Sequence, residues 1–114
     1  MSNAYALGLN RNAAGLKEGS PAVYAMIKSR AVAEWEDDHT MVVFVINQQA
    51  DSLVVCDKLF ETNRDIVVRA VIEWCDGGLA VLKTYDDKNM YEAPVDWAMV
   101  EFISKRQIDA EGSY

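Results

Sequence analysis

Hydrophobic residues recur at helical spacing between residues 20 and 37. Ser20 is a preferred N-cap, and Pro21 suits the first helical position because no intrahelical N–H bond is made there. The apolar side chains that follow are spaced by three or four residues: Tyr24, Ile27, Ala31 and Trp35, with Val23 alongside. This pattern predicts a helix from Pro21 to about Asp37 that buries one face, Trp35 included.

A second helical pattern begins at Pro94 and continues to residue 107. Its apolar positions that share one face are Val95, Met99, Phe102 and Ile103. Asp96 in the first turn and Lys105 with Arg106 in the last turn both favour a helix, because their charges complement the helix dipole. The segment predicts a C-terminal helix, with Trp97 in the core.

Four apolar segments between these helices are rich in β-branched residues and predict β-strands. They are residues 41–47, 52–61, 66–74 and 79–85. The pair Gly77–Gly78 separates the last two, and glycine readily adopts the positive φ angles that a tight hairpin turn requires. We therefore expect a hairpin at this pair, with Trp74 and Tyr85 facing each other across it.

Residues 62–78 also fit a helix capped by Thr62 or Asn63 and ended by Gly77. The β-branched residues in this stretch favour the strand: Ile66, Val67, Val68, Val71 and Ile72. The strand is the preferred interpretation, and the helix remains open.

The order of these elements predicts an α+β fold. One helix would precede a roughly four-stranded, mostly antiparallel meander, and the C-terminal helix would pack on the sheet. Residues 1–19 have no sustained period and few apolar anchors, so they are expected to form an extended N-terminal arm. The expected organisation is therefore the arm, a single domain over residues 20–107, and a polar tail over residues 108–114.

Composition and charge narrow the class of protein. A hydrophobic fraction of 51% and a charged fraction of 25% are typical of a packed domain. The net charge of −7 disfavours direct nucleic-acid binding, which needs clustered basic residues. No apolar run approaches the roughly 18 residues of a membrane span, and no secretory signal opens the chain. The expected location is the cytoplasm or an assembled particle.

The stretch "AEWEDDHT", residues 33–40, holds four carboxylates and the single histidine of the chain. A catalytic metal site usually takes three protein ligands whose side chains converge. Asp37, Asp38 and His39 are adjacent, so their side chains are expected to diverge. The stretch therefore predicts a solvated helix end and turn, with no metal ligands and no catalytic residues assigned.

The two cysteines, Cys56 and Cys75, are interpreted as buried, reduced thiols. Neither lies in the electropositive setting that lowers a thiol pKa, so a Cys–His couple with His39 is disfavoured. No cofactor-binding motif is present, and no cofactor is expected.

The charge distribution favours a protein-binding function without enzymatic activity. Residues 1–33 carry four basic residues and one acidic residue, whereas residues 34–114 carry seven basic and seventeen acidic ones. We expect an assembly subunit, possible in a virion, whose basic arm and first helix dock on the acidic body of a neighbouring copy or partner. The alternatives are an acidic inhibitor, immunity or anti-defence protein that binds a basic target, and a small-molecule-binding domain or enzyme. The residues expected to make contact are Leu7, Leu9, Arg11, Lys17, Glu34, Glu36, Asp37, Asp38 and Tyr91, the last because it is the aromatic residue freest to do so.

Overall fold

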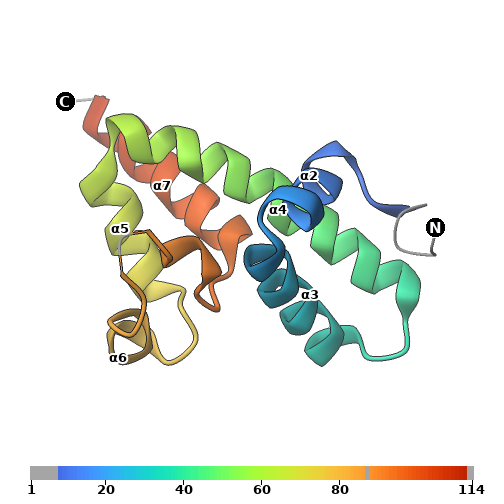
Figure 1. Ribbon diagram of the computed structural model, residues 1–114. Coiled ribbons are helices and arrows are strands. Elements are labelled where there is room, and N and C mark those ends of the chain that lie inside the picture. The colour runs from blue at the N-terminus through green and yellow to red at the C-terminus, as the bar shows by residue number, and fades with distance from the viewer. Residues whose placement is uncertain (1–7, 87, 113–114) are drawn as a thin grey trace. The chain divides into compact units, whose positions relative to one another are not determined.

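The computed structural model describes residues 8–86 and 88–112, and these residues fold as helices (Figure 1). The elements are α2 (Arg11–Gly19), α3 (Pro21–Trp35), α4 (His39–Thr62), α5 (Arg64–Glu73), α6 (Gly78–Leu82), the 3-10 helix η1 (Met90–Glu92) and α7 (Trp97–Gly112). Within the described ranges the one β-type pairing is an isolated antiparallel bridge between Cys75 and Val95. The expected α+β fold and its four-stranded meander are therefore wrong.

The first two expected strands lie within the single long helix α4. Its buried apolar positions follow a helical period: Val42, Ile46, Ala50, Leu53 and Cys56. The β-branched residues around them suit a strand, but that preference amounts to a few tenths of a kcal/mol per residue. Burying a large apolar side chain contributes about 1.5–3 kcal/mol, so the spacing of the buried positions outweighs the local preference.

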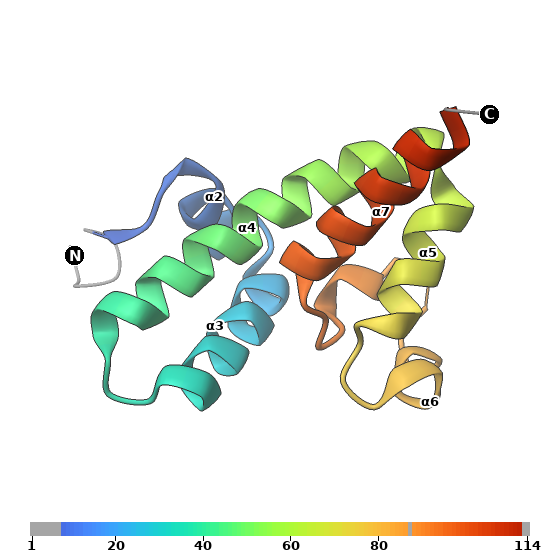
Figure 2. The ribbon, with the colours of Figure 1, turned by 180° about the vertical axis from the view of Figure 1, so that it is seen from behind.

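The third expected strand is helix α5, so the helical alternative was correct. Asn63 occupies the N-cap position, and the helix ends at Trp74, whose N–H donates to the carbonyl of Ala70 at 3.0 Å. The buried side chains of α5 are Val67, Ala70 and Val71, which form one helical face. Figures 1 and 2 both show α5 beside α7, and the two helices are in contact.

Gly77 and Gly78 adopt positive φ angles of 84° and 64°, as the sequence predicted. They do not form a hairpin, because they connect the end of α5 to the short helix α6. The expected pairing of Trp74 with Tyr85 across a hairpin is therefore wrong as well.

The chain divides into two compact units, Met1–Asp51 and Ser52–Tyr114, with the boundary inside α4. In the first unit, α3 begins at Pro21 as predicted and buries Val23, Tyr24, Ile27 and Ala31. Trp35 was expected on this buried face but is 37% exposed. Residues 11–19 were expected to be extended, but they form α2, which packs against α3.

A set of side-chain hydrogen bonds fixes the start of α2 against α4 within the first unit. Asn10 caps α2 by accepting from the Ala13 N–H at 2.9 Å, and its own N–H donates to Asn47 Oδ1 at 2.9 Å. The side-chain amides of Asn10 and Asn12 donate to Asp51 Oδ1 at 3.0 and 2.9 Å. Because three α4-directed bonds come from residues 10–12, this segment is held in place without an apolar core of its own.

In the second unit, α7 packs against α5. Trp97 is 1% exposed, as predicted, and Val100 and Ser104 are also buried. The expected buried face was partly wrong, since Phe102 is 53% exposed. Residues 108–112 of the expected polar tail belong to α7.

Candidate functional site

The stretch with four carboxylates is a helix end followed by a turn, which confirms the interpretation made from the sequence. Helix α3 ends at Trp35, and α4 begins at His39. Asp38 Oδ1 accepts a hydrogen bond from the Met41 N–H at 3.1 Å, so this carboxylate satisfies a donor of the first turn of α4. Glu36 has φ 48° and ψ −110°, a conformation that residues other than glycine rarely adopt.

We call residues 34–38 the acidic turn. The side chains of Glu34, Glu36, Asp37 and Asp38 are all exposed, so the structure brings these four predicted contact residues together on the surface. Trp35 lies between them and is 37% exposed. An exposed tryptophan that is flanked by carboxylates along the chain was not predicted from the sequence, because Trp35 was expected in the core.

The two basic residues predicted to make contact, Arg11 and Lys17, lie in α2. Of the two leucines predicted with them, Leu7 lies outside the described residues. Leu9 is half-buried before the helix, and Arg11 is exposed in its first turn. Lys17 Nζ lies 5.9 Å from the centre of the Tyr24 ring, in a cation–π contact that joins α2 to α3.

Tyr91, in η1, is held within the second unit rather than free. Its hydroxyl donates to Asp57 Oδ1 at 2.6 Å, and its ring packs edge-on against Trp97 with ring centres 5.5 Å apart. Burial, and then the hydrogen bond to Asp57, raises the pKa of Tyr91 above its ordinary value. Tyr91 therefore ties η1 to α4 and α7.

Both cysteines are buried and reduced, as expected from the sequence, although they lie in a helix and a bridge rather than in strands. Burial is the main cause that raises the pKa of Cys56 from 9.0 to about 12. The thiol of Cys56 is therefore neutral at pH 7 and is a poor nucleophile. Its Sγ atom lies 3.7 Å from the carbonyl oxygen of Trp97, in the core of the unit.

The raised pKa of Cys56 predicts alkaline destabilisation. The unfolded chain releases the thiol proton near pH 9, whereas the folded chain retains it until about pH 12. The stability that this group contributes is present below pH 9 and is lost as the pH rises toward 12. We expect the free energy of unfolding of the wild type to fall more steeply over this range than that of Cys56→Ala, as measured by urea unfolding at fixed ionic strength. Parallel slopes for the two proteins would contradict the prediction.

Within residues 8–86 and 88–112, His, Cys, Asp and Glu side chains do not gather in groups of three that could hold a metal ion. None of the helices in the same ranges combines the length and apolar character needed to cross a membrane.

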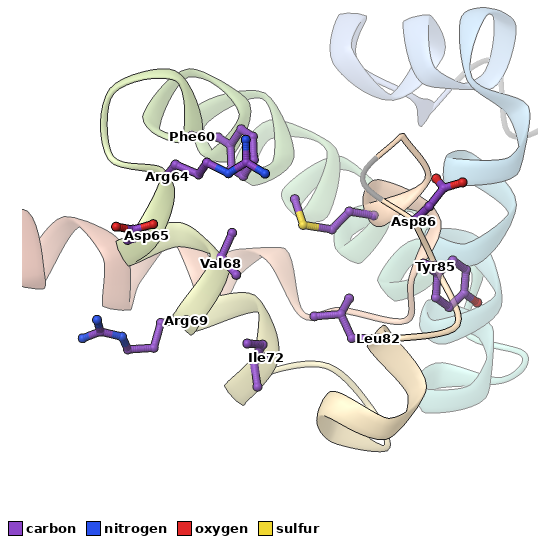
Figure 3. Close-up of a pocket in the computed structure, with 10 residues that line it drawn as sticks. Phe60, Arg64, Asp65, Val68, Arg69, Ile72, Leu82, Tyr85 and Asp86 are labelled. Carbon is purple, nitrogen blue, oxygen red and sulfur yellow. The ribbon is translucent and has the colours of Figure 1, made fainter.

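A hollow of the second unit lies between α5 and the segment that contains α6 and η1 (Figure 3). We call it the α5 cavity; its volume is about 450 Å³. Its lining residues are Phe60, Arg64, Asp65, Val68, Arg69, Ile72, Leu82, Tyr85, Asp86 and Met90. The cavity was not predicted from the sequence, because a strand was the preferred interpretation of residues 66–74. The helical alternative contained the signal, since Arg64, Val68 and Ile72 are spaced by four residues and share a helix face.

A smaller hollow of about 290 Å³ lies between α5 and α7. Ile66 and Ala70 of α5 and Ile103 of α7 form its apolar part, and Arg69 and Arg106 lie at its edge. The guanidinium of Arg106 lies 5.6 Å from the centre of the Phe102 ring.

No protein-family model, curated protein or solved structure matches this chain.

Proposed function

We propose that this chain is a non-enzymatic protein-binding module and that the acidic turn is its contact surface. The partner that fits is a protein with a basic surface and an apolar recess. The observation that carries the proposal is the exposure of Trp35 between Glu34 and Glu36. Tryptophan is among the residues that contribute most at protein interfaces, and the surrounding carboxylates would speed association with a basic partner and select for it.

The backbone of the acidic turn supports the same surface. The positive φ of Glu36 costs on the order of 1–3 kcal/mol relative to an ordinary conformation, and a glycine would relieve that cost. Strained residues of this kind cluster at binding and catalytic sites. A glutamate at this exposed position is therefore better explained by recognition than by stability.

Self-assembly through the basic N-terminal segment is a second possible way for this chain to bind protein, and it has less support. Residues 10–12 direct their hydrogen bonds to α4 of the same unit, and Lys17 contacts Tyr24. These groups already have partners within the chain. Light scattering on the full chain tests this form, since it predicts a defined oligomer.

The test of the acidic turn uses a triple variant, Glu34→Lys with Trp35→Ala and Asp37→Lys. Asp38 is left unchanged because it caps α4. Proteins retained by the immobilised wild type from an extract of the cells that make it are identified by mass. The purified partner is then titrated by calorimetry. We expect the triple variant to bind at least tenfold more weakly, because it loses the apolar anchor and reverses two charges.

The matched control is Glu18→Lys with Phe102→Ala and Glu111→Lys, which makes the same charge change and removes one exposed aromatic ring elsewhere. This control should bind within twofold of the wild type. Equal affinity of the triple variant and the wild type would contradict the proposal. Wild-type protein that retains no partner, or an oligomer that persists in the triple variant, would contradict it as well.

A further inference from the structure

The hollow between α5 and α7 is an apolar groove with one arginine on each helix, and we call it the α5–α7 groove. Its lining residues are Ile66, Arg69, Ala70 and Glu73 from α5, and Ile103, Arg106, Gln107 and Ala110 from α7. Each set has the spacing i, i+3, i+4 and i+7, which places its four residues on one face of a helix. The isoleucine and the arginine occupy corresponding positions in the two sets. Because α5 and α7 pack against each other, the two faces form one groove within the second unit.

The groove is open to solvent. Arg69 and Arg106 are exposed, and Ile66 and Ile103 are half-buried, so part of each isoleucine still presents apolar surface to water. A partner that covers this surface gains hydrophobic free energy. The volume of about 290 Å³ lies at the lower limit of the roughly 300–1,000 Å³ that is typical of small-molecule sites. An open groove of this size suits one large side chain of a protein partner.

The charges at the groove favour an acidic partner. In Figure 3, Arg69 extends away from the apolar residues of the α5 cavity, and its guanidinium makes no hydrogen bond or ion pair with another described residue. The guanidinium of Arg106 lies 5.6 Å from the centre of the Phe102 ring, and that ring is 53% exposed, so this contact lies at the surface. Glu73 opposes the two arginines, which leaves the groove with an excess of one positive charge.

The acidic turn has the chemistry that this groove accepts. Trp35 is 37% exposed and is a large apolar side chain, and the carboxylates of Glu34 and Asp37 beside it are exposed. A tryptophan in an apolar recess, with carboxylates next to arginines, is the kind of contact that dominates protein interfaces and selects the partner. The α5 cavity is a poorer match, because Asp65 and Asp86 line it and would repel the acidic turn.

We propose that the α5–α7 groove of one copy of this chain receives the acidic turn of a second copy. Trp35 of one copy enters between Ile66 and Ile103 of the other, and the carboxylates of the turn lie beside Arg69 and Arg106. The inference rests on the proposed function, because it uses the same acidic turn, and it identifies the partner as the chain itself. The turn and the groove are different surfaces, so the contact is head-to-tail.

The association is expected to be weak. Each copy has a net charge of −7, so two copies repel each other at long range. At 0.15 M salt this repulsion is screened beyond about 8 Å, whereas carboxylates in direct contact with arginines still attract them. We therefore expect a dissociation constant on the order of 10–100 μM, which is typical of small, transient interfaces.

The first test measures the association of the full chain by sedimentation velocity at pH 7 and 0.15 M salt, over concentrations that span the expected dissociation constant. We expect the wild type to associate. The triple variant of the acidic turn and the groove variant, Arg69→Glu with Arg106→Glu, should each associate at least tenfold more weakly. The matched control is Lys58→Glu with Lys83→Glu, which makes the charge change of the groove variant at two exposed residues outside the groove. It should associate within twofold of the wild type.

A mixture of the two variants tests whether the contact forms between copies. The triple variant retains the groove, and the groove variant retains the acidic turn, so together they supply one matching pair of surfaces. The ¹⁵N-labelled triple variant is titrated with the unlabelled groove variant and followed by two-dimensional NMR. We expect saturable shifts in α5 and α7 of the labelled chain and, with the labels exchanged, in residues 34–38. Shifts concentrated in α2 would assign the association to the N-terminal segment and would overturn the proposal.

The remaining outcomes separate this inference from the proposed function. A wild type that stays monomeric, or a groove variant that associates as tightly as the control, would overturn this inference alone, because the acidic turn would still bind a different basic protein. Equal association of the triple variant and the wild type would contradict both. The amide spectrum of each variant shows whether it is folded. If the groove variant is unfolded, Arg69→Gln with Arg106→Gln takes its place, because it removes the two charges without reversing them.

Discussion

Replacement of Trp97 by alanine is expected to lower the free energy of unfolding of the second unit by about 3–5 kcal/mol. Trp97 is 1% exposed and is among the largest fully buried side chains in the described part of the chain. It also supports the ring of Tyr91, which attaches η1 to α4. Its removal leaves a void that the helices around it can fill only in part. Urea unfolding followed by far-ultraviolet circular dichroism measures the loss.

The control for this substitution lies on the same helix. Phe102→Ala also removes an aromatic ring from α7, but that ring is 53% exposed and contacts Arg106. We expect it to cost about 1 kcal/mol at most, since exposed cation–π contacts contribute about 0.5–1 kcal/mol. Similar losses for the two substitutions would show that Trp97 does not form the core of the unit.

Replacement of Gly77 by alanine is expected to cost about 2–5 kcal/mol, from two sources. Its φ of 84° lies in the left-handed region, where a Cβ atom costs roughly 1–2 kcal/mol. A Cβ atom at Gly77 would also clash with Cγ2 of Val81, and forcing an extra group into such a contact costs about 1–3 kcal/mol. The same unfolding measurement tests this expectation.

The neighbouring glycine separates the two sources. Gly78 has a φ of 64°, but a Cβ atom there would meet open space. Gly78→Ala should therefore lose only the conformational part, about 1–2 kcal/mol. A smaller loss for Gly77→Ala than for Gly78→Ala would contradict the packing of α6 described here.

The features that could be predicted from the sequence are those set by a few neighbouring residues. Ser20 and Pro21 indicated the start of α3, because the caps of a helix depend on local backbone chemistry. The run of carboxylates at residues 34–38 indicated a turn, and Gly77–Gly78 indicated positive φ angles. The burial of Trp97 followed from its helical context.

The tertiary structure alone decided between strand and helix in the middle of the chain. The β-branched residues of α4 and α5 prefer strands locally, but their buried positions are spaced for a helix that packs against another helix, and this spacing prevails because burial is worth more than local preference. Trp35 and Phe102 are exposed, although each continues the apolar face of its helix. The spacing of apolar residues along a helix does not show how much of that face another element covers. The α5 cavity also depends on the fold, because Phe60, Val68 and Met90 are far apart in the sequence. They line one space only in the folded second unit, where Cys75 and Val95 pair in an antiparallel bridge.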